Sequence, residues 1–392
     1  MVCKSYSDLE RLLGISVKAL YSVSNASWKH YRSVKIPKND RGEFRELHVP
    51  DEFLKTVQRR IADRLLSAYP VSPYATAYRP GGSTIVNARP HVGKNVLLKL
   101  DIHHFFDNIL YATVKEKAFP AEDYSESIRI LLTILCVHKD ALPQGAPTSP
   151  VISNIIMRDF DCTVGGWCDA RGIAYTRYCD DMTFSGDFDS REVVRLVRTE
   201  LRKMGLFLNE KKTVRAVRGQ RQSVTGLVVN EGLRIPAAYR KKLRQEVYYC
   251  RKFGVAAHLQ RMGSGERAED YLPKLLGRIN YACSVMPDDQ ELILEIAKVI
   301  RVGFLQQNAF HKDDTCVPME KQFKMMDVIL YLYKKSRSLI SMGMPMSVLK
   351  EDSIFDKIIS IKYDVPNDHL EMLDDYKKQI DRFYDDVVER NA

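Results

Sequence analysis

The sequence predicts an α+β protein built around an antiparallel sheet. Residues 173–186 form two short apolar segments around a tight turn, which is typical of a β-hairpin. Residues 95–102 form a short apolar run that ends near a carboxylate, as expected of a buried strand. Before and after these strands, apolar residues recur at helical spacing and predict amphipathic helices that pack beside the sheet.

The charge of the chain is unevenly distributed. The 392 residues, enough for two or three domains, include 60 Lys and Arg against 50 Asp and Glu, a net charge of +10. From residue 311 onward there are 13 basic and 16 acidic residues, so residues 1–310 carry +13. A basic body predicts a polyanionic partner, and the acidic tail predicts a different one. Lysines that are simply solvated are the alternative.

The cysteines and the apolar segments indicate the compartment. Eight cysteines are scattered without a Cys-x-x-Cys pair or a His-rich spacing, which argues against zinc and fits the reduced thiols of a cytoplasmic protein. No apolar stretch reaches the about 18 residues that cross a bilayer. We therefore expect a cytoplasmic protein without a membrane partner.

The N-terminal part alternates helices with an extended segment. Residues 1–35 read as short helices, and residues 41–50 alternate like one arm of a hairpin. Residues 51–68 place their apolar side chains on one helical face. Prolines and the pair Gly81-Gly82 then break the chain into loops. This glycine pair is either a phosphate cradle or plain turn chemistry.

The middle of the chain carries a rigid loop that opens a helix. Helices extend to about residue 136, and residues 142–150 form a loop rich in proline and glycine. Ser149 as cap and Pro150 in the first turn predict a helix from this point. Its shared apolar face comprises Ile152, Ile155, Ile156 and Phe160.

The remaining elements complete the sheet and begin a helical region. Residues 191–204 are a strongly periodic helix closed by Gly205. We predict strands over residues 206–213, which are basic, and over residues 223–229. From Pro236 the pattern is helical to about residue 310.

Three aspartates form the constellation that carries chemistry. Asp101 stands where a strand becomes a turn, and Asp180 and Asp181 lie at the tip of the predicted hairpin. Adjacent carboxylates repel one another, so a fold retains them mainly beside a cation. Carboxylates from two neighbouring strands can hold two Mg²⁺ ions about 3.5 to 4 Å apart, the layout of two-metal nucleotidyl transfer. We predict Asp101 and Asp180 as bridging ligands and Asp181 as a supporting ligand; a polar turn and a strand-end cap are the alternative.

With these residues in view, residues 40–310 resemble the reverse transcriptases. The matching elements, in the family's order, are Asp101 with Phe106, residues 142–145 (Leu-Pro-Gln-Gly), residues 178–181 (Tyr-Cys-Asp-Asp), and Gly205-Leu206 with residues 211–213. Residues 87–91 (Asn-Ala-Arg-Pro-His) and 224–226 (Val-Thr-Gly) resemble elements of the bacterial retron reverse transcriptases in particular. Cys179, where alanine is usual, and the pair His103-His104 depart from the common pattern.

The resemblance implies a right-hand polymerase with fingers, palm and thumb. Residues 1–94 would hold the N-terminal region and fingers, and residues 95–235 an antiparallel palm with fingers elements at about 115–147. Residues 236–310 would be the thumb and residues 311–392 a helical C-terminal extension. That extension either docks a partner protein or caps the thumb.

The resemblance also assigns residues to the nucleotide. Phe106 would be the steric gate that favours dNTPs, with a core phenylalanine as the alternative. Gln144 and Gly145 would contact the incoming dNTP, and Lys212 would lie near the leaving pyrophosphate. Arg45 and Arg79 are candidates for triphosphate contacts, and the metal set would include the backbone carbonyl of Ile102.

Nucleic-acid contacts are expected from two groups of residues. The resemblance implies that Asn87, His91, Val224, Thr225 and Gly226 help to recognise a structured RNA, although His91 is equally consistent with a structural histidine. The basic residues of the first thumb helix would track the phosphates of a duplex; they are Arg240, Lys241, Lys242, Arg244, Arg251 and Lys252.

The predicted function follows from the resemblance. A retron enzyme reverse transcribes its structured noncoding RNA, primed from a guanosine 2′-hydroxyl, into branched multicopy single-stranded DNA (msDNA). It uses dNTPs and two Mg²⁺ ions, and it commonly acts with an effector protein, here of unknown identity, in antiphage defence. The alternatives are another bacterial reverse transcriptase, of the group II intron or abortive-infection type, and a catalytically idle RNA-binding scaffold.

Overall fold

The structure is a computed structural model that describes residues 3–37, 44–287 and 289. The chain divides into two compact units, Met1–Pro236 and Ala237–Ala392, and each is described by itself. The boundary falls where the sequence predicts the start of the thumb. The predicted C-terminal extension, residues 311–392, lies outside the described residues.

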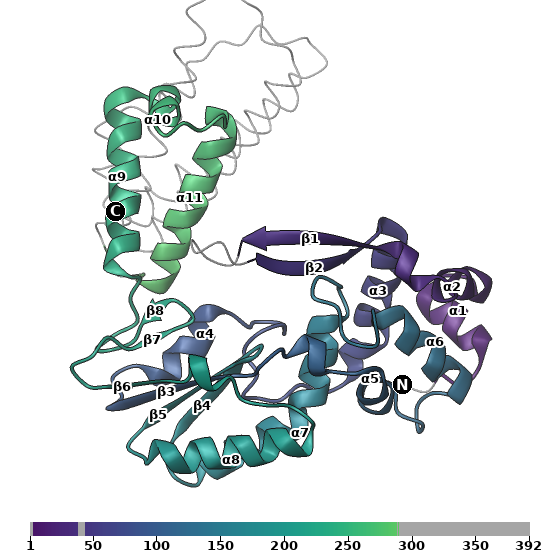
Figure 1. The fold of residues 1–392 in the computed structure, drawn as a ribbon. Coiled ribbons are helices and arrows are strands. Elements are labelled where there is room, and N and C mark those ends of the chain that lie inside the picture. Colours follow the sequence, from purple (N-terminus) through teal and green to yellow (C-terminus); the bar gives the residue numbers. More distant parts are fainter. Residues whose placement is uncertain (1–2, 38–43, 288, 290–392) are drawn as a thin grey trace, which may run out of the picture. The chain divides into compact units, whose positions relative to one another are not determined.

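The first unit is organised around a four-stranded antiparallel sheet with strand order β4-β5-β3-β6 (Figure 1). Its strands are β3 (Val96–Asp101), β4 (Ala174–Tyr178), β5 (Asp181–Gly186) and β6 (Val214–Val217). The hairpin β4–β5 and the buried strand β3 confirm the predicted α+β class and its antiparallel sheet. Because β3 lies in the middle, its end is flanked by the tip of the hairpin.

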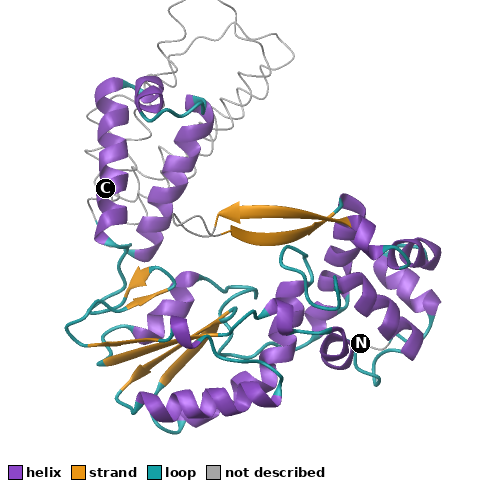
Figure 2. Ribbon diagram, viewed as in Figure 1, coloured by secondary structure: helices purple, strands orange, loops and turns teal. Residues whose placement is uncertain are grey.

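Helices α7 (Ser149–Asp169) and α8 (Ser190–Lys203) lie along the sheet (Figures 1 and 2). The predicted helix start is confirmed to within one residue, because Thr148 occupies the cap position and Pro150 the first turn. Both helices bury an apolar face at helical spacing. The buried apolar residues include Ile152, Ile156, Phe160 and Val164 of α7 and Val193, Val197 and Leu201 of α8. The apolar faces of the two helices therefore belong to the same hydrophobic core as the buried side chains of the sheet.

Several helices of the first unit precede β3 in the sequence or lie between β3 and β4. They are α1 (Tyr6–Leu13), α2 (Val17–Ser24), α3 (Glu52–Arg64), α5 (Tyr111–Ala118) and α6 (Glu126–Cys136). Single 3₁₀ turns occur at Ser27–His30, Leu66–Ala68 and Phe106–Asn108. Side-chain caps fix two of the helix starts: Ser5 and Asp8 form a capping box, and Asp51 accepts from the backbone N–H of Leu54.

A separate hairpin pairs β1 (Tyr31–Pro37) with β2 (Phe44–Pro50). The second strand confirms most of the extended segment predicted over residues 41–50. The first strand corrects the helical prediction for residues 31–35, because pairing with β2 holds them extended. Residues 38–43, which join the two strands, lie outside the described residues.

The glycine pair at residues 81–82 opens the short helix α4 (Thr84–Ala88), which leads into a 3₁₀ turn at Arg89–His91. A Cβ on Gly82 would lie 2.4 Å from the carbonyl oxygen of Thr76, so only glycine fits this approach. The side chain of Ser83 caps α4 by accepting from the backbone N–H of Val86. The geometry favours turn chemistry over a phosphate cradle.

Two strand predictions need correction. Residues 206–213 are not a strand: Leu208 makes a single bridge to Ile102, and Glu210–Lys212 form a 3₁₀ turn. Regular pairing with β3 is limited to β6, because the 3₁₀ turn at Glu210–Lys212 separates β6 from the single bridge at Leu208. Residues 223–229 form a tight hairpin, β7 (Ser223–Val224) and β8 (Leu227–Val228), instead of one strand.

The second unit contains α9 (Ala237–Phe253), α10 (Val255–Arg261) and α11 (Ala268–Val285). Glu246 of α9 is buried and accepts hydrogen bonds from the hydroxyl of Tyr271 and the guanidinium of Arg278, both on α11. This buried carboxylate holds the two helices together. Within the described parts of both units, the structure contains no helix that is apolar and long enough to cross a membrane.

Candidate active site

The hairpin turn brings two aspartates to the end of the central strand. Cys179, in the turn, has a left-handed backbone with φ of 61°, a rare conformation for a residue other than glycine. Asp180 follows it, and Asp181 begins β5 directly opposite Asp101 of β3. The backbone N–H of Ile102 also donates to the carbonyl oxygen of Asp180, at 3.2 Å. The structure therefore brings the three predicted carboxylates to one end of the sheet.

Asp101 is held by two residues of the segment after α8. Its side chain is only 7% exposed. One carboxylate oxygen accepts from the Nζ of Lys212 at 2.7 Å and the other from the Nδ2 of Asn209 at 3.1 Å. The backbone N–H of Asn209 also donates to the carbonyl oxygen of Asp101, at 2.8 Å. The 3₁₀ turn at Glu210–Lys212, where a strand was predicted, thus brings Lys212 to Asp101. Among the described contacts, the neighbouring Lys211 has no hydrogen bond to Asp101.

The three carboxylates crowd one another electrostatically. Burial, together with the charges of Asp180 and Asp101, raises the pKa of Asp181 to about 6. Burial also raises the pKa of Asp180, and the charge of Asp101 acts in the same direction. Burial works to lower the pKa of Lys212, but its hydrogen bond to Asp101 and the charges of the aspartates outweigh this, and its pKa is raised. Lys99 and Lys212 both act on Asp181 as cations, and the three carboxylates outnumber them.

The oxygen donors of this site suit a hard divalent cation, which prefers carboxylates. In the described chain, however, no three His, Cys, Asp or Glu side chains are gathered closely enough to hold a metal ion as they stand. The carboxylate of Asp101 is turned to Lys212 and Asn209 instead. The donor set fits a divalent cation in its chemistry, and the Asp101 side chain would have to turn from Lys212 to join it.

The Gln144-Gly145 loop packs against the second strand of the separate hairpin. The carbonyl oxygen of Gln144 accepts from the backbone N–H of His48 at 2.8 Å. Gly145 has φ of 118°, and an added Cβ would lie 3.0 Å from the carbonyl oxygen of His48. Glycine is therefore required here by both its backbone angle and its close approach. The side chain of Gln144 is half-buried.

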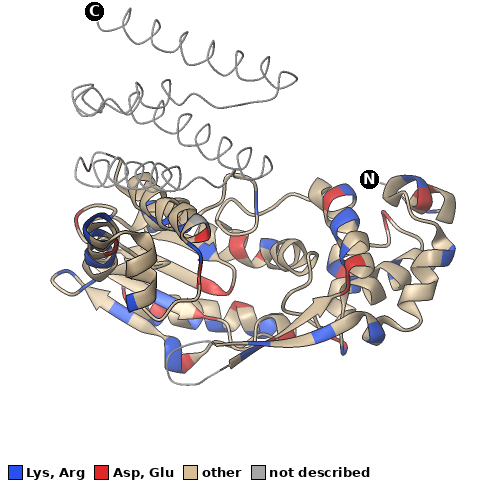
Figure 3. Cartoon of the chain, turned by 90° about the horizontal axis from the view of Figure 1, so that it is seen from above, with Lys and Arg blue, Asp and Glu red and all other residues tan. Residues whose placement is uncertain are grey.

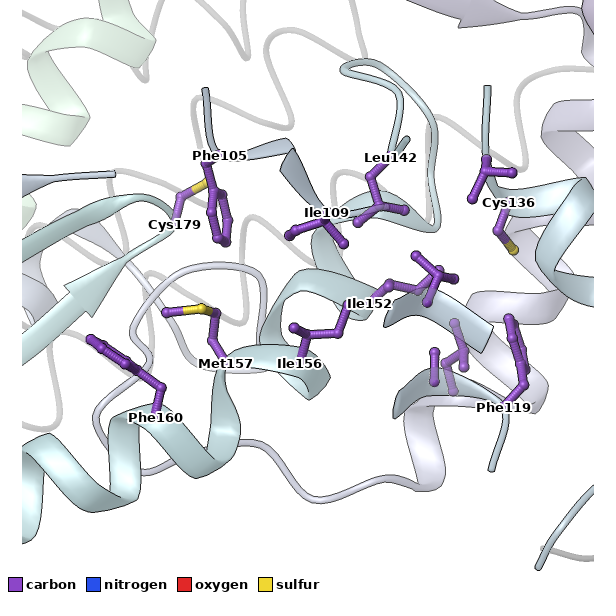
Figure 4. Close-up of a cluster of buried hydrophobic side chains, with 14 of the residues drawn as sticks. Phe105, Ile109, Phe119, Cys136, Leu142, Ile152, Ile156, Met157, Phe160 and Cys179 are labelled. Atoms are coloured by element: carbon purple, nitrogen blue, oxygen red, sulfur yellow. The ribbon is translucent and has the colours of Figure 1, made fainter. Parts of the chain in front are cut away.

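Phe105 and Phe106 have different environments. Phe105 is 3% exposed and lies beside Cys179 above the apolar side chains of α7, among them Met157 and Phe160 (Figure 4). Phe106 is only partly buried and packs on the edge of that core, with its ring centroid 5.2 Å from that of Phe105. Of the two rings, only Phe106 has a free edge that a substrate sugar could meet.

The two arginines predicted to contact the triphosphate differ. Arg45 lies on β2 and its side chain is exposed. Arg79 donates from Nη1 to the carbonyl oxygens of Ser72 and Ala75, at 3.2 and 3.3 Å. Arg79 therefore braces its own loop through Nη1, although it is exposed like Arg45.

Of the residues expected to recognise RNA, Asn87, His91 and Val224 are buried, Thr225 is half-buried and Gly226 is exposed. His91 is 0% exposed, and its ring nitrogens contact the hydroxyls of Ser185 at 2.7 Å and Thr176 at 2.8 Å. Burial lowers its pKa to about 3, so the ring is neutral at physiological pH. The geometry favours the alternative interpretation of His91 as a structural histidine.

Asn87 lies beside the Val-Thr-Gly element. Asn87 is buried, accepts from Thr76 Oγ1 at 2.7 Å and lies 3.4 Å from the hydroxyl of Thr225. Thr225 also donates to the carbonyl oxygen of Thr84 at 3.1 Å. Val224 is buried, and Gly226 completes the turn with φ of 82°. The side chains of Asn87 and Thr225 thus have hydrogen-bond partners inside the protein. Their contacts with RNA stay a prediction.

The basic residues predicted on the first thumb helix lie on α9. Lys241, Lys242, Arg244, Arg251 and Lys252 are exposed. Arg240 is half-buried and pairs with Asp289 at 2.9 Å. Figure 3 shows that basic residues are spread over both units and interspersed with acidic ones. Binding of a duplex by α9 stays a prediction.

Sequence reasoning missed two contributors to the site. Asn209 holds Asp101 from both its side chain and its backbone, and only the register of the chain after α8 reveals this. Arg177 lies in the middle of the apolar strand β4 and is fully buried. An arginine between core residues of a predicted strand was the available signal, because such a charge is buried only with a partner.

Comparison with known proteins agrees with this geometry. Residues 36–231 match the family model described as reverse transcriptase (RNA-dependent DNA polymerase). The chain is 35% identical over 282 residues to the retron Mx65 reverse transcriptase of Myxococcus xanthus, covering 66% of each chain. It is 31% identical over 267 residues to the retron Ec86 reverse transcriptase of Escherichia coli, covering 66% of this chain and 82% of that one.

A second similarity is of a different kind. Residues 283–349 match the C-terminal domain of V and A type ATP synthase. The chain is also 42% identical over 106 residues to the V-type ATP synthase alpha chain 2 of Clostridium tetani, covering 27% of this chain and 18% of that one. This match overlaps the last part of the range predicted for the thumb.

The first match spans half of the chain and contains the three aspartates, the Gln144-Gly145 loop and Lys212. The two retron enzymes each align with about two thirds of the chain. The chain therefore belongs to the bacterial retron reverse transcriptases.

Proposed function

We propose that this protein is an RNA-directed DNA polymerase that extends a DNA strand on its own structured noncoding RNA. The observation that carries the proposal is the convergence of Asp101 and Asp181, opposite one another in register, with Asp180 at the adjoining turn. The chain spans 66% and 82% of the lengths of the two retron relatives. Because both relatives are retron enzymes, we infer that the template is a retron RNA.

Each residue near the aspartates has a role in this reaction. Asp101 and Asp180 would hold two Mg²⁺ ions with support from Asp181, and these ions would activate the attacking hydroxyl and stabilise the leaving pyrophosphate. Lys212, an ammonium at the edge of the site, is placed to donate a proton to the departing phosphate. Gln144 and Gly145 orient the dNTP, and Phe106 meets its sugar and favours the deoxy form.

The substrate is a folded RNA, and the product is msDNA joined to it. Priming from a guanosine 2′-hydroxyl, association with an effector protein, and a role in antiphage defence in the cytoplasm belong to this proposal through the family alone. The basic residues of α9 and their interleaved tyrosines would bind the template-primer duplex through its phosphates and shape.

The match at residues 283–349 lies outside the residues assigned to this chemistry. All the residues assigned to catalysis lie within residues 36–231. For the whole chain, we propose a nucleotidyltransferase that also carries a segment similar to an ATP synthase. The catalytic residues are assigned to the first unit only.

Primer extension on an RNA template tests the proposal. With Mg²⁺ and dNTPs, the wild-type protein should make DNA, and Asp180→Asn should reduce kcat by at least about 1,000-fold, because it removes a carboxylate that would hold the Mg²⁺ ions, which neutralise the negative charge of the transition state. The circular dichroism spectrum and Tm should stay close to wild type, since the substitution removes charge from a crowded site. A wild-type protein as inactive as Asp180→Asn would instead favour the idle RNA-binding scaffold.

A further inference from the structure

A fully buried ion pair lies directly behind the catalytic turn. Arg177 of β4 and Asp161 of α7 are both 0% exposed. The guanidinium donates from Nε and Nη2 to the two carboxylate oxygens of Asp161, at 2.8 and 2.7 Å. The hydroxyl of Tyr175 donates to the same carboxylate at 2.9 Å. Every oxygen of Asp161 therefore has a charged or polar donor.

The remaining arm of Arg177 reaches the catalytic turn itself. Its Nη1 donates to the carbonyl oxygen of Cys179 at 2.8 Å. Cys179 is the residue with the left-handed backbone, immediately before Asp180. A strained conformation of this kind persists only where surrounding contacts hold it. The guanidinium is such a contact, because it fixes the direction of the peptide group that leads into the aspartates.

The pair also links the turn to the helix that begins at the nucleotide loop. Nη2 of Arg177 contacts the Oδ1 of Asn154 at 3.2 Å, and Asn154 donates to the carbonyl oxygen of Ala77 at 2.9 Å. Asn154 and Asp161 both lie on α7, two helical turns apart, and α7 starts four residues after Gly145. One rigid helix therefore sets both the loop assigned to the dNTP and the turn assigned to the metal ions.

Stability alone does not explain this arrangement. Burying two charges costs desolvation that their attraction only partly returns, and apolar residues of similar volume often serve the fold equally well. A guanidinium is, however, the one side chain that can bind a carboxylate with two nitrogens and a backbone carbonyl with a third.

We propose that Asp161 and Arg177 are positioning residues for the catalytic turn: together they hold the Cys179 carbonyl and thereby set Asp180 and Asp181 for metal binding. The proposal rests on the nucleotidyl transfer proposed above. Asp161 orients the guanidinium, and the guanidinium orients the turn, although neither residue meets the substrate.

A matched pair of substitutions tests it. Arg177→Lys retains a charge beside Asp161 but leaves the Cys179 carbonyl without its donor. Arg129→Lys is the control, because Arg129 of α6 is also buried, pairs with Glu116 and Glu126, and donates to a backbone carbonyl, that of Phe119, at 2.7 Å. Arg129 does not contact the catalytic turn, so it reports the cost of the same change elsewhere in the unit.

We expect Arg177→Lys to lower kcat by about 100-fold, as a displacement of about 1 Å in a catalytic group does. The KM for dNTP should change by less than about threefold, and the Mg²⁺ concentration for half-maximal rate should rise about tenfold. Arg129→Lys should change kcat by less than about threefold at a temperature where both variants are folded. Equal losses of kcat in the two variants would overturn the proposal.

A second variant separates positioning from folding. The triple substitution Tyr175→Phe, Asp161→Leu and Arg177→Met removes the buried charges together with their other donor, so that no charged group is left unpaired. It should keep the Tm within a few degrees of wild type and still lose kcat. A stable triple variant with wild-type kcat would refute a positioning role.

A binding measurement makes the test independent of polymerisation. Mn²⁺ binding followed by electron paramagnetic resonance should be weaker in Arg177→Lys than in Arg129→Lys. If the wild-type protein bound Mn²⁺ but made no DNA, the proposed function would fail and this comparison would still judge the positioning role. Identical Mn²⁺ affinities in the two variants would contradict it.

Discussion

Two of the antiparallel hairpins in the first unit, β4–β5 and β1–β2, form by the same local rules but differ in how far they are buried. The hairpin β4–β5 is buried along most of both strands, whereas β1–β2 is exposed over most of its length. In β5, Phe184 is 0% exposed and its ring centroid is 4.7 Å from that of Tyr175. In β2, Phe44 is 61% exposed.

The difference teaches where a fold can carry concentrated charge. Asp180 and Asp181 repel one another and Asp101, and the turn that holds them is strained at Cys179. Such a site needs a rigid surrounding, which packing on both faces and a buried ion pair supply. The described residues of β1 and β2 carry no such cluster, and most of them are exposed, which suits contacts with a soluble substrate.

The largest contrast between the hairpins should appear in stability. Phe184→Ala should lower the free energy of unfolding by about 4 kcal/mol, because it removes a fully buried ring and leaves a cavity. Phe44→Ala, the same change on the exposed hairpin, should stay within about 0.5 kcal/mol of wild type. Urea denaturation of both variants measures the difference, and similar losses would show that β1–β2 is buried in the protein in solution.

A smaller effect is expected in the pH dependence of stability, because His91 is buried against the hairpin β4–β5. His91 bridges β4 and β5, and burial lowers its pKa to about 3. The unfolded chain takes up this proton near pH 6.5 and the folded chain does not, so stability is lost as the pH falls through this window. Between pH 7.5 and pH 5.0 the loss from this one group should be about 2 kcal/mol.

His91→Gln isolates that contribution. The variant should lose about 2 kcal/mol less than wild type between the two pH values, whatever its stability at pH 7.5. Urea denaturation at both values gives the difference. Lys94 is the charged group that acts on His91. Equal losses in the two proteins would mean that His91 becomes charged inside the folded unit.

The smallest effect belongs to the exposed hairpin. Arg45→Gln should raise the KM for dNTP about fivefold, about 1 kcal/mol, because a solvated contact with the triphosphate is weak. The Tm should not change, since the side chain is exposed. Arg32→Gln, an exposed arginine near the base of the same hairpin, is the control and should leave KM unchanged. An equal KM for all three proteins would remove Arg45 from the dNTP site.

The sequence alone was enough to predict those features that depend on side-chain type and on local pattern. The aspartates, the hairpin that carries two of them and the helix at Ser149 could be predicted because turn residues, caps and apolar periodicity are local signals. The strand over residues 206–213 was predicted wrongly, since its alternation is overridden by a 3₁₀ turn that presents Lys212 to Asp101. The role given to Arg79 loses support for a similar reason, because its partners are carbonyls of its own loop.

By itself, then, the sequence determined which residues carry charge and that residues 95–102 and 173–186 become the central strands, because these follow from side-chain chemistry over a few neighbouring positions. Only the tertiary structure decided that Asp101 faces Asp181, that His91 is enclosed, and that Arg177 joins Asp161 to the carbonyl of Cys179. These pairings connect residues from different elements, and the burial that makes them strong exists only after the elements have packed.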